Sequence, residues 1–185
     1  DIGKPSHRSV DKNGAISFYG HEVAGGELAA SLCSRLCFSN KEIDFVRQLV
    51  RQHMRPIHLF NLTSTSKRAL CRFFRLGPEL FWPLLLLFAS DYKATQGPHA
   101  LGGDLESLRQ KMHSWLDFYD SQLRPRELEP PLVSGHDILD NLNLSPGPIV
   151  GKILNTLAEL QWEGCISTRQ QALDHAAELL KRWKR

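Results

Sequence analysis

Apolar residues recur along most of the chain with the 3.6-residue period of an α-helix. From Glu22 onward they stand at positions 23, 24, 28, 32 and 36. Only residues 15–19 alternate as a short strand would. The pattern therefore predicts an all-α fold, a helical bundle followed by a small helical tail. Further helical stripes run over residues 38–54, 63–76, 105–123, 136–144, 147–164 and 167–185.

Start and stop signals divide this pattern into helices. Ser39 or Asn40, followed by acidic residues, is a suitable N-cap, and Pro56 is expected to end that helix. Gly77-Pro78 stops the next helix, and Gly147-Pro148 starts one in the tail. The apolar run 80–89 predicts a helix buried on all sides, which begins or bends at Pro83. This run is too short for a bilayer, which needs about 20 residues, so no membrane association is expected.

Composition suggests a domain boundary after the helical stripe at residues 105–123. Residues 124–135 contain three prolines and read as a linker between a domain at 1–123 and a tail at 136–185. Residues 93–104 have the Gly, Pro and Thr content of a loop. Four cysteines occur without a C-x-x-C pair, and Cys33 and Cys37 share a helix face with leucines. Buried free thiols and a cytoplasmic location are therefore expected.

Positive charge is concentrated in one part of an otherwise mildly basic chain, whose formal net charge is +3. Residues 41–75 contain eight Lys or Arg against two acids. Two helical ridges of cations could bind phosphates, one of Arg47, Arg51 and Arg55 and one of Arg68, Arg72 and Arg75. A solvated surface is the alternative. The C-terminal KRWKR could bind single-stranded nucleic acid by stacking and charge, or could simply be a basic helix end. The residues that we predict to contact phosphates are Arg47, Arg51, Lys67, Arg68, Arg72 and Lys152.

Four potential metal ligands are expected at helix ends, where distant parts of the chain can converge. They are Asp1, His21, His53 and Asp91. Imidazole and carboxylate groups suit borderline or hard divalent cations. A structural explanation stands beside this one, because His53 would be favoured at a helix C-terminus and His21 beside Glu22 at an N-terminus. No pair has the i, i+4 spacing of a helical metal motif, so spacing alone does not decide.

Taken together, several motifs resemble a known family. DIGKP, D-x-x-G-x-I-x-F-x-G-H-E, R-L-x-F-S-N, L-V-R-x-H-M-R-P and K-R-A-L-x-R-F-F-R resemble the HD-domain half of bacterial tRNA nucleotidyltransferases and poly(A) polymerases. The stretch from SGHDILDNLNLSPGPIVG to Q-x-E-G-x-I-x-T-R-x-x-A resembles the tail of the same family. The resemblance covers nearly the whole chain in order. It does not separate CCA-adding, poly(A)-adding and HD-only members.

The resemblance implies that the helical bundle is HD-domain-like, and it implies a role for the candidate ligands. Asp1 matches the Asp of the His-Asp doublet, and His21, His53 and Asp91 match later metal positions. The doublet's His and an earlier His would precede Asp1, so these four residues are expected to be a remnant of a site for Mg, Mn or Ni. The nucleotide-transferring head, with its Gly-Ser loop and paired carboxylates, is not found in these residues, and no catalytic residue is assigned.

Three functions follow as alternatives. The first is the RNA-binding C-terminal portion of a tRNA nucleotidyltransferase or poly(A) polymerase. It would bind tRNA or an RNA 3′ end, through the six residues predicted above to contact phosphates, for an N-terminal nucleotidyltransferase domain. The second is an HD-type metal-dependent phosphohydrolase acting on nucleotides or 2′,3′-cyclic phosphates. The third is a helical module in which the HD residues only support the core.

Overall fold

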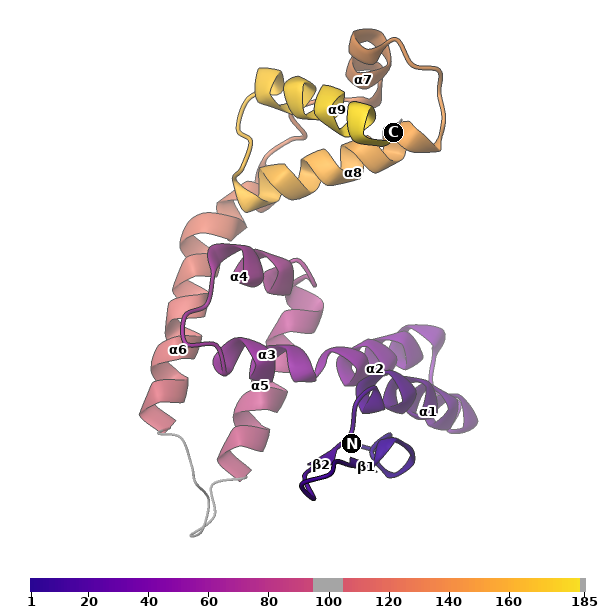
Figure 1. Ribbon diagram of the computed structural model, residues 1–185, viewed down its shortest axis with the longest axis vertical. Helices are drawn as coiled ribbons and strands as arrows, with labels where there is room; N and C mark the ends of the chain where they lie inside the picture. The colour runs from indigo at the N-terminus through magenta and orange to yellow at the C-terminus, as the bar shows by residue number, and fades with distance from the viewer. Residues whose placement is uncertain (95–104, 184–185) are drawn as a thin grey trace. The chain divides into compact units, whose positions relative to one another are not determined.

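The computed structural model describes residues 1–94 and 105–183, and its fold is all-α, as the sequence predicts (Figure 1). The strands are confined to a hairpin in which β1 pairs antiparallel with β2, Ser9 opposite Ser17. The predicted loop at 93–104 and the end of KRWKR lie largely outside the described residues. The elements are η1 Pro5–His7, β1 Ser9–Val10, β2 Ile16–Ser17, α1 His21–Arg35, α2 Asn40–Gln52, α3 Met54–Phe60, α4 Lys67–Phe74, α5 Pro78–Ala94, α6 Leu105–Phe118, the π-helical turn η2 Tyr119–Leu123, the 3₁₀ turn η3 Arg124–Leu128, α7 Gly135–Leu142, α8 Pro148–Glu163 and α9 Arg169–Trp183.

The chain forms two compact units, Asp1–Met112 and His113–Arg185. The division falls within α6, whereas composition places it at the proline-rich segment 124–135. That segment is folded: it begins with η3, and Val133 is buried in the core of the second unit. Gln161 of α8 accepts a hydrogen bond from the backbone N–H of Leu132, which holds the segment against α8.

Serine side chains cap helices in both units. Ser39 starts α2 with a capping box: its hydroxyl accepts from the Glu42 N–H, and Glu42 accepts from the Ser39 N–H. Ser66 caps α4, and Ser134 starts α7 with a second capping box. In the tail, α8 begins at Pro148, which confirms the predicted Gly-Pro start.

The prediction that Pro56 ends a helix is wrong by one turn. The helix α2 ends at Gln52, and Pro56 lies in the first turn of α3. Proline has no N–H to donate to the carbonyl four residues earlier, and its ring clashes with that carbonyl. The helical ladder therefore breaks at Gln52 and restarts at Met54, which leaves His53 at the junction between α2 and α3.

The buried face of α1 is also not the predicted leucine stripe. Leu28, Leu32 and Leu36 are exposed, whereas Gly25, Gly26 and Ala30 are buried. The two helices α1 and α2 lie side by side in Figure 1 and contact each other along this glycine face. A Cβ at Gly26 would lie 2.5 Å from Cγ of Arg51 on α2, so only glycine permits this approach. Small residues on α1 therefore decide which of its faces is buried.

Two further expectations about burial are wrong. Of the four free cysteines only Cys71 is buried, and Cys37 and Cys165 are exposed. The apolar helix α5 buries one side, including Phe81 and Leu84, but Leu86 on the other side is 66% exposed. Among the described residues no single helix is long and apolar enough to span a bilayer; α4 and α5 reach that length and composition only as a pair bent by 111°.

Each unit has its own buried core. In the first unit the Phe81 ring packs edge-on against Phe74, with ring centroids 4.9 Å apart, and Phe73 lies against both. In the second unit the core joins α7, α8 and α9 and includes Ile138, Ile153 and Ala176, all fully buried. Hydrophobic burial of this kind is the main stabilising contribution in each unit.

Candidate metal centre and nucleic-acid interface

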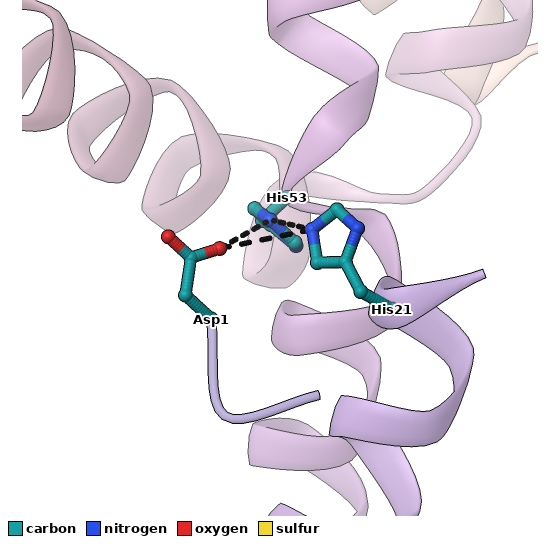
Figure 2. Close-up of side chains that lie close together, drawn as sticks. All are labelled: Asp1, His21 and His53. Carbon is teal, nitrogen blue, oxygen red and sulfur yellow. Dashed lines mark hydrogen bonds and ion pairs between the residues drawn. The ribbon is translucent and has the colours of Figure 1, made fainter. Parts of the chain in front are cut away.

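Two histidines that are 32 residues apart in sequence meet at the N-terminus of α1 (Figure 2). Gly20, in a left-handed conformation with φ 82°, turns the chain from the β-hairpin into α1, so His21 is the first helical residue. His53 occupies the break between α2 and α3 that Pro56 causes. The two rings pack edge to face with centroids 5.3 Å apart.

Both imidazoles are oriented by backbone carbonyls. Nδ1 of His21 lies 2.7 Å from the Phe18 carbonyl oxygen, and Nδ1 of His53 lies 2.6 Å from that of Val50. A carbonyl only accepts hydrogen bonds, so each Nδ1 carries the proton and donates it. In the neutral rings Nε2 then holds a lone pair, and the two Nε2 atoms face each other at 3.4 Å. Histidine ligands in metal sites typically donate the N–H of the nitrogen that does not bind the metal to a backbone carbonyl or a carboxylate, as Nδ1 does here.

Asp1 completes a triangle of ligand atoms. Its Oδ1 lies 3.7 Å from Nε2 of His21 and 3.7 Å from Nε2 of His53. Ligand atoms about 2.1 Å from a tetrahedral ion lie roughly 3.4 Å from one another. The three atoms are therefore spaced as one face of a coordination shell. Two imidazoles and one carboxylate suit a borderline first-row ion such as Ni²⁺ better than the hard ions Mn²⁺ and Mg²⁺, which prefer oxygen ligands.

A close backbone contact brings Asp1 to the histidines. A Cβ at Gly3 would overlap the His21 carbonyl oxygen and lie 2.7 Å from the Gly25 nitrogen. Real Cβ atoms do not approach so closely, so Gly3 and Gly25 together let the N-terminal segment cross α1 at contact distance. The sequence alone does not single out Gly25. Gly3, two residues after the candidate ligand Asp1, is a position at which the sequence does suggest a close backbone contact.

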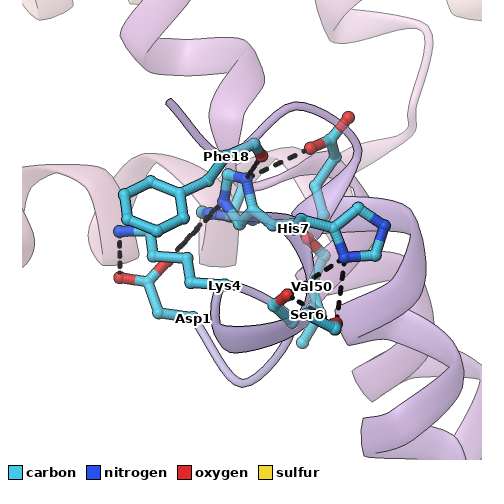
Figure 3. A network of polar contacts seen from close by, with 10 residues as sticks. Asp1, Lys4, Ser6, His7, Phe18 and Val50 are labelled. Atoms are coloured by element: carbon cyan, nitrogen blue, oxygen red, sulfur yellow. Dashed lines mark hydrogen bonds and ion pairs between the residues drawn. The ribbon is translucent and has the colours of Figure 1, made fainter. Parts of the chain in front are cut away.

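A polar network fixes the other side of the Asp1 carboxylate (Figure 3). Lys4 Nζ lies 2.7 Å from Asp1 Oδ2 and 5.7 Å from the centre of the Phe18 ring. In η1, His7 Nδ1 lies within hydrogen-bonding distance of the Gly3 carbonyl and the Ser6 hydroxyl. One carboxylate oxygen of Asp1 is therefore occupied by Lys4, and the other remains directed at the imidazoles.

The cluster is half enclosed. His21 is buried at 6% exposure, whereas the Asp1 side chain is 61% exposed. Burial lowers the pKa of His53, and the nearby His21 lowers it further, while the hydrogen bond to Val50 acts in the opposite direction. The neutral, metal-binding form of His53 is therefore favoured.

Asp91, the fourth predicted ligand, lies near the cluster but not in it. It lines a cavity of about 340 Å³ together with Asp1 and His53. The ligand atoms that lie within 4.8 Å of one another come from Asp1, His21 and His53 alone among the described residues. The structure thus brings three predicted ligands together and places the fourth on the wall of the adjoining cavity.

The predicted RNA-binding cations fall into two groups. Arg47 and Arg51, on α2, are ion-paired with Glu27 of α1, and Arg47 also pairs with Asp44. Glu27 lies outside residues 41–75, and helix packing brings it to these arginines. The positive charge of this region is therefore lower than its own residues indicate. These two arginines hold α1 against α2, in addition to any role at the surface.

The remaining predicted cations lie on the surfaces of other helices. Lys67, Arg68 and Arg72 are exposed on α4 in the first unit, and Lys152 is exposed on α8 in the second. Arg55, which the sequence places in one ridge with Arg47 and Arg51, lies beyond the helix break on α3. The first of the two predicted ridges is therefore divided between two helices.

The fold and the site define an all-helical protein with a candidate divalent-metal cluster and exposed basic helices. No protein-family model matches the chain. Over 93% of its length it is 32% identical to the CC-adding tRNA nucleotidyltransferase of Thermus thermophilus and, again at 32%, to the A-adding tRNA nucleotidyltransferase of Deinococcus radiodurans. It is 30% identical over 86% of its length to the CC-adding tRNA nucleotidyltransferase of Synechocystis sp..

The chain is therefore a homologue of part of the tRNA nucleotidyltransferases, consistent with a C-terminal portion of such an enzyme. It spans 36%, 38% and 34% of these three relatives, about a third of their length. The resemblance drawn from the sequence motifs is confirmed at this level. A CC-adding and an A-adding relative match equally well, so the comparison does not assign one of these specificities.

Proposed function

We propose that this chain is the RNA-binding portion of a tRNA nucleotidyltransferase. It would bind tRNA or an RNA 3′ end while a nucleotidyltransferase domain of the same protein adds nucleotides. The observation that carries the proposal is the similarity to tRNA nucleotidyltransferases over 93% of the chain. The exposed cations Lys67, Arg72 and Lys152 support it, because none of them is ion-paired within residues 1–94 and 105–183.

A salt titration of tRNA binding tests the proposal. Binding to phosphates releases counterions, so the logarithm of the affinity should fall linearly with the logarithm of the salt concentration. Replacing Lys67, Arg72 and Lys152 singly by Gln should reduce that slope by about one for each phosphate that is no longer neutralised. Fluorescence anisotropy with end-labelled tRNA gives both quantities.

Lys12→Gln is the matched control, because Lys12 is exposed in the β-hairpin and outside the proposed surface. Its slope should equal that of the unchanged chain. An affinity for tRNA that hardly changes between low and moderate salt would exclude phosphate contacts by these residues.

We also propose that Asp1, His21 and His53 bind a divalent ion, with Ni²⁺ favoured over Mn²⁺ by the donor set. Bound there, the ion would act as a Lewis acid toward a phosphate oxygen. His21 and His53 would supply Nε2, and the Phe18 and Val50 carbonyls would keep both rings in the required tautomer. Hydrolysis of 2′,3′-cyclic phosphates, the alternative function, depends on this site.

Isothermal titration with MnCl₂ and NiCl₂ tests the metal proposal without depending on activity. His53→Ala should abolish binding, whereas His113→Ala should leave it unchanged, because His113 lies in the second unit and is paired with Asp117. The same proteins are assayed with 2′,3′-cyclic AMP. Metal binding that survives in His53→Ala would contradict the ligand assignment, and equal hydrolysis by both variants would contradict the alternative function.

A further inference from the structure

A second cavity in the first unit carries positive charge and an apolar floor. Its volume is about 300 Å³, and α3, α4 and the segment between them form it. Leu59 and Phe73, both buried, form its floor, and Leu62 and Ala69 extend that apolar surface. The remaining lining residues are Arg55, His58 and Arg72.

The charge of this cavity is not neutralised. No carboxylate lines it among the described residues, and neither Arg55 nor Arg72 has an ion pair within them. Arg55 Nη1 lies 3.5 Å from the backbone oxygen of Arg72, which joins α3 to the last turn of α4 at the edge of the cavity. Two guanidinium groups and an imidazole therefore surround one small apolar space.

This combination suits one nucleotide of an RNA chain. Arginine presents several N–H donors in a planar fork that matches phosphate oxygens. Histidine donates a further hydrogen bond in either protonation state. A base or ribose can bury its apolar surface on the Leu59 and Phe73 floor, and the volume is at the lower end of the range for small-molecule sites.

We propose that this cavity is a nucleotide-binding subsite, in which Arg55 and Arg72 bind a phosphate and the apolar floor receives the attached nucleoside. The proposal rests on the RNA-binding function and adds Arg55 and His58 to the residues that would contact RNA. His58 also lines a neighbouring cavity with His21 and Lys4. An RNA strand that binds in the cavity of α3 and α4 and continues past His58 would therefore pass close to the candidate metal cluster.

The subsite is tested with a small probe before RNA is used. AMP is titrated into the ¹⁵N-labelled chain, and the amide signals of α3 and α4 are followed, with adenosine and inorganic phosphate as separate arms. AMP should shift these signals at lower concentration than either fragment. Arg55→Gln and Arg72→Gln should each weaken AMP binding roughly tenfold, the value of one hydrogen bond to a charged group. Arg8→Gln, at an exposed position following η1, should bind as the unchanged chain does.

Binding of labelled tRNA by the same variants separates this proposal from the function on which it rests. Weaker tRNA binding by Arg55→Gln, with Arg8→Gln unchanged, supports the subsite. If tRNA binds but AMP does not, or if AMP and inorganic phosphate bind equally well, the nucleotide subsite is overturned and the RNA-binding function stands. If AMP binds at α3 and α4 but no tRNA binds, the subsite is supported and the RNA-binding function is overturned.

Discussion

At the scale of single residues, the candidate metal cluster depends on groups that are not ligands. Pro56 breaks the helix so that His53 lies at a junction, and two carbonyls hold the imidazoles with Nε2 inward. Gly3 and Gly25 provide the backbone contact that brings Asp1 within 3.7 Å of both rings. The ligand types were predictable from the sequence, whereas these positioning residues became evident only when the distances were known.

Gly3→Ala should therefore weaken metal binding although it removes no ligand. A Cβ there would meet the His21 carbonyl and must displace the Asp1 segment. We expect a loss of metal affinity of about 10- to 100-fold, as for other positioning residues at metal sites. Titration calorimetry with MnCl₂ measures it.

Gly151→Ala is the control for that substitution, because a Cβ at Gly151 meets nothing within 4 Å and the residue lies inside α8. It should leave metal binding unchanged. Full affinity in Gly3→Ala would show that Asp1 does not depend on this contact.

At the scale of elements, capping chemistry was the most reliable signal. Ser39 and Ser134 both start helices with reciprocal capping boxes, and Gly147-Pro148 starts α8. These signals are local, since the cap and its partner are three residues apart. The buried face of α1 was predicted wrongly because the leucine stripe is a local pattern, whereas the partner helix α2 selects the glycine face.

The α7 cap makes the stability of the second unit depend on pH. Asp137 accepts hydrogen bonds from Arg169 and from the Ser134 N–H and hydroxyl, and these lower the pKa of its carboxyl well below the usual value, with Arg169 contributing most. A carboxyl whose pKa is lowered by folding stabilises the folded state above its unfolded pKa of about 3.9. This stabilisation is lost as the pH falls below that value.

Asp137→Asn should therefore be less stable than the unchanged chain at pH 7, and the difference should shrink steadily below about pH 4. Urea unfolding at a series of pH values gives the difference in free energy of unfolding. The other acids remain in both proteins, so their contributions cancel. A difference that is constant from pH 7 to pH 3 would show that the Asp137 charge does not contribute.

At the scale of the whole molecule, each compact unit contains a core of its own. Ile153 is fully buried in the core of α7, α8 and α9. Ile153→Ala should lower the free energy of opening in these helices by about 2–5 kcal/mol, the usual cost of a large-to-small change in a core. Amide hydrogen exchange resolves where the loss occurs.

We expect the loss to be confined to the second unit, with protection in α4 and α5 unchanged, because a unit with its own core opens as a cooperative unit. Leu86→Ala, at an exposed position on α5, is the control and should change neither unit appreciably. An equal loss in both units would mean that they open as one cooperative structure.

The chain's own residue pattern was enough to predict the helical class, most helix starts and the relation to tRNA nucleotidyltransferases, because periodicity, caps and motifs are encoded within short stretches. The sequence also predicted Asp1, His21 and His53 as ligands, but these residues converge only because α1 packs on α2. Packing also paired Glu27 with Arg47 and Arg51, and it placed Arg55 and Arg72 around one cavity. Such contacts join residues far apart in sequence, so only the tertiary structure decided which charges are neutralised and which are available to a ligand.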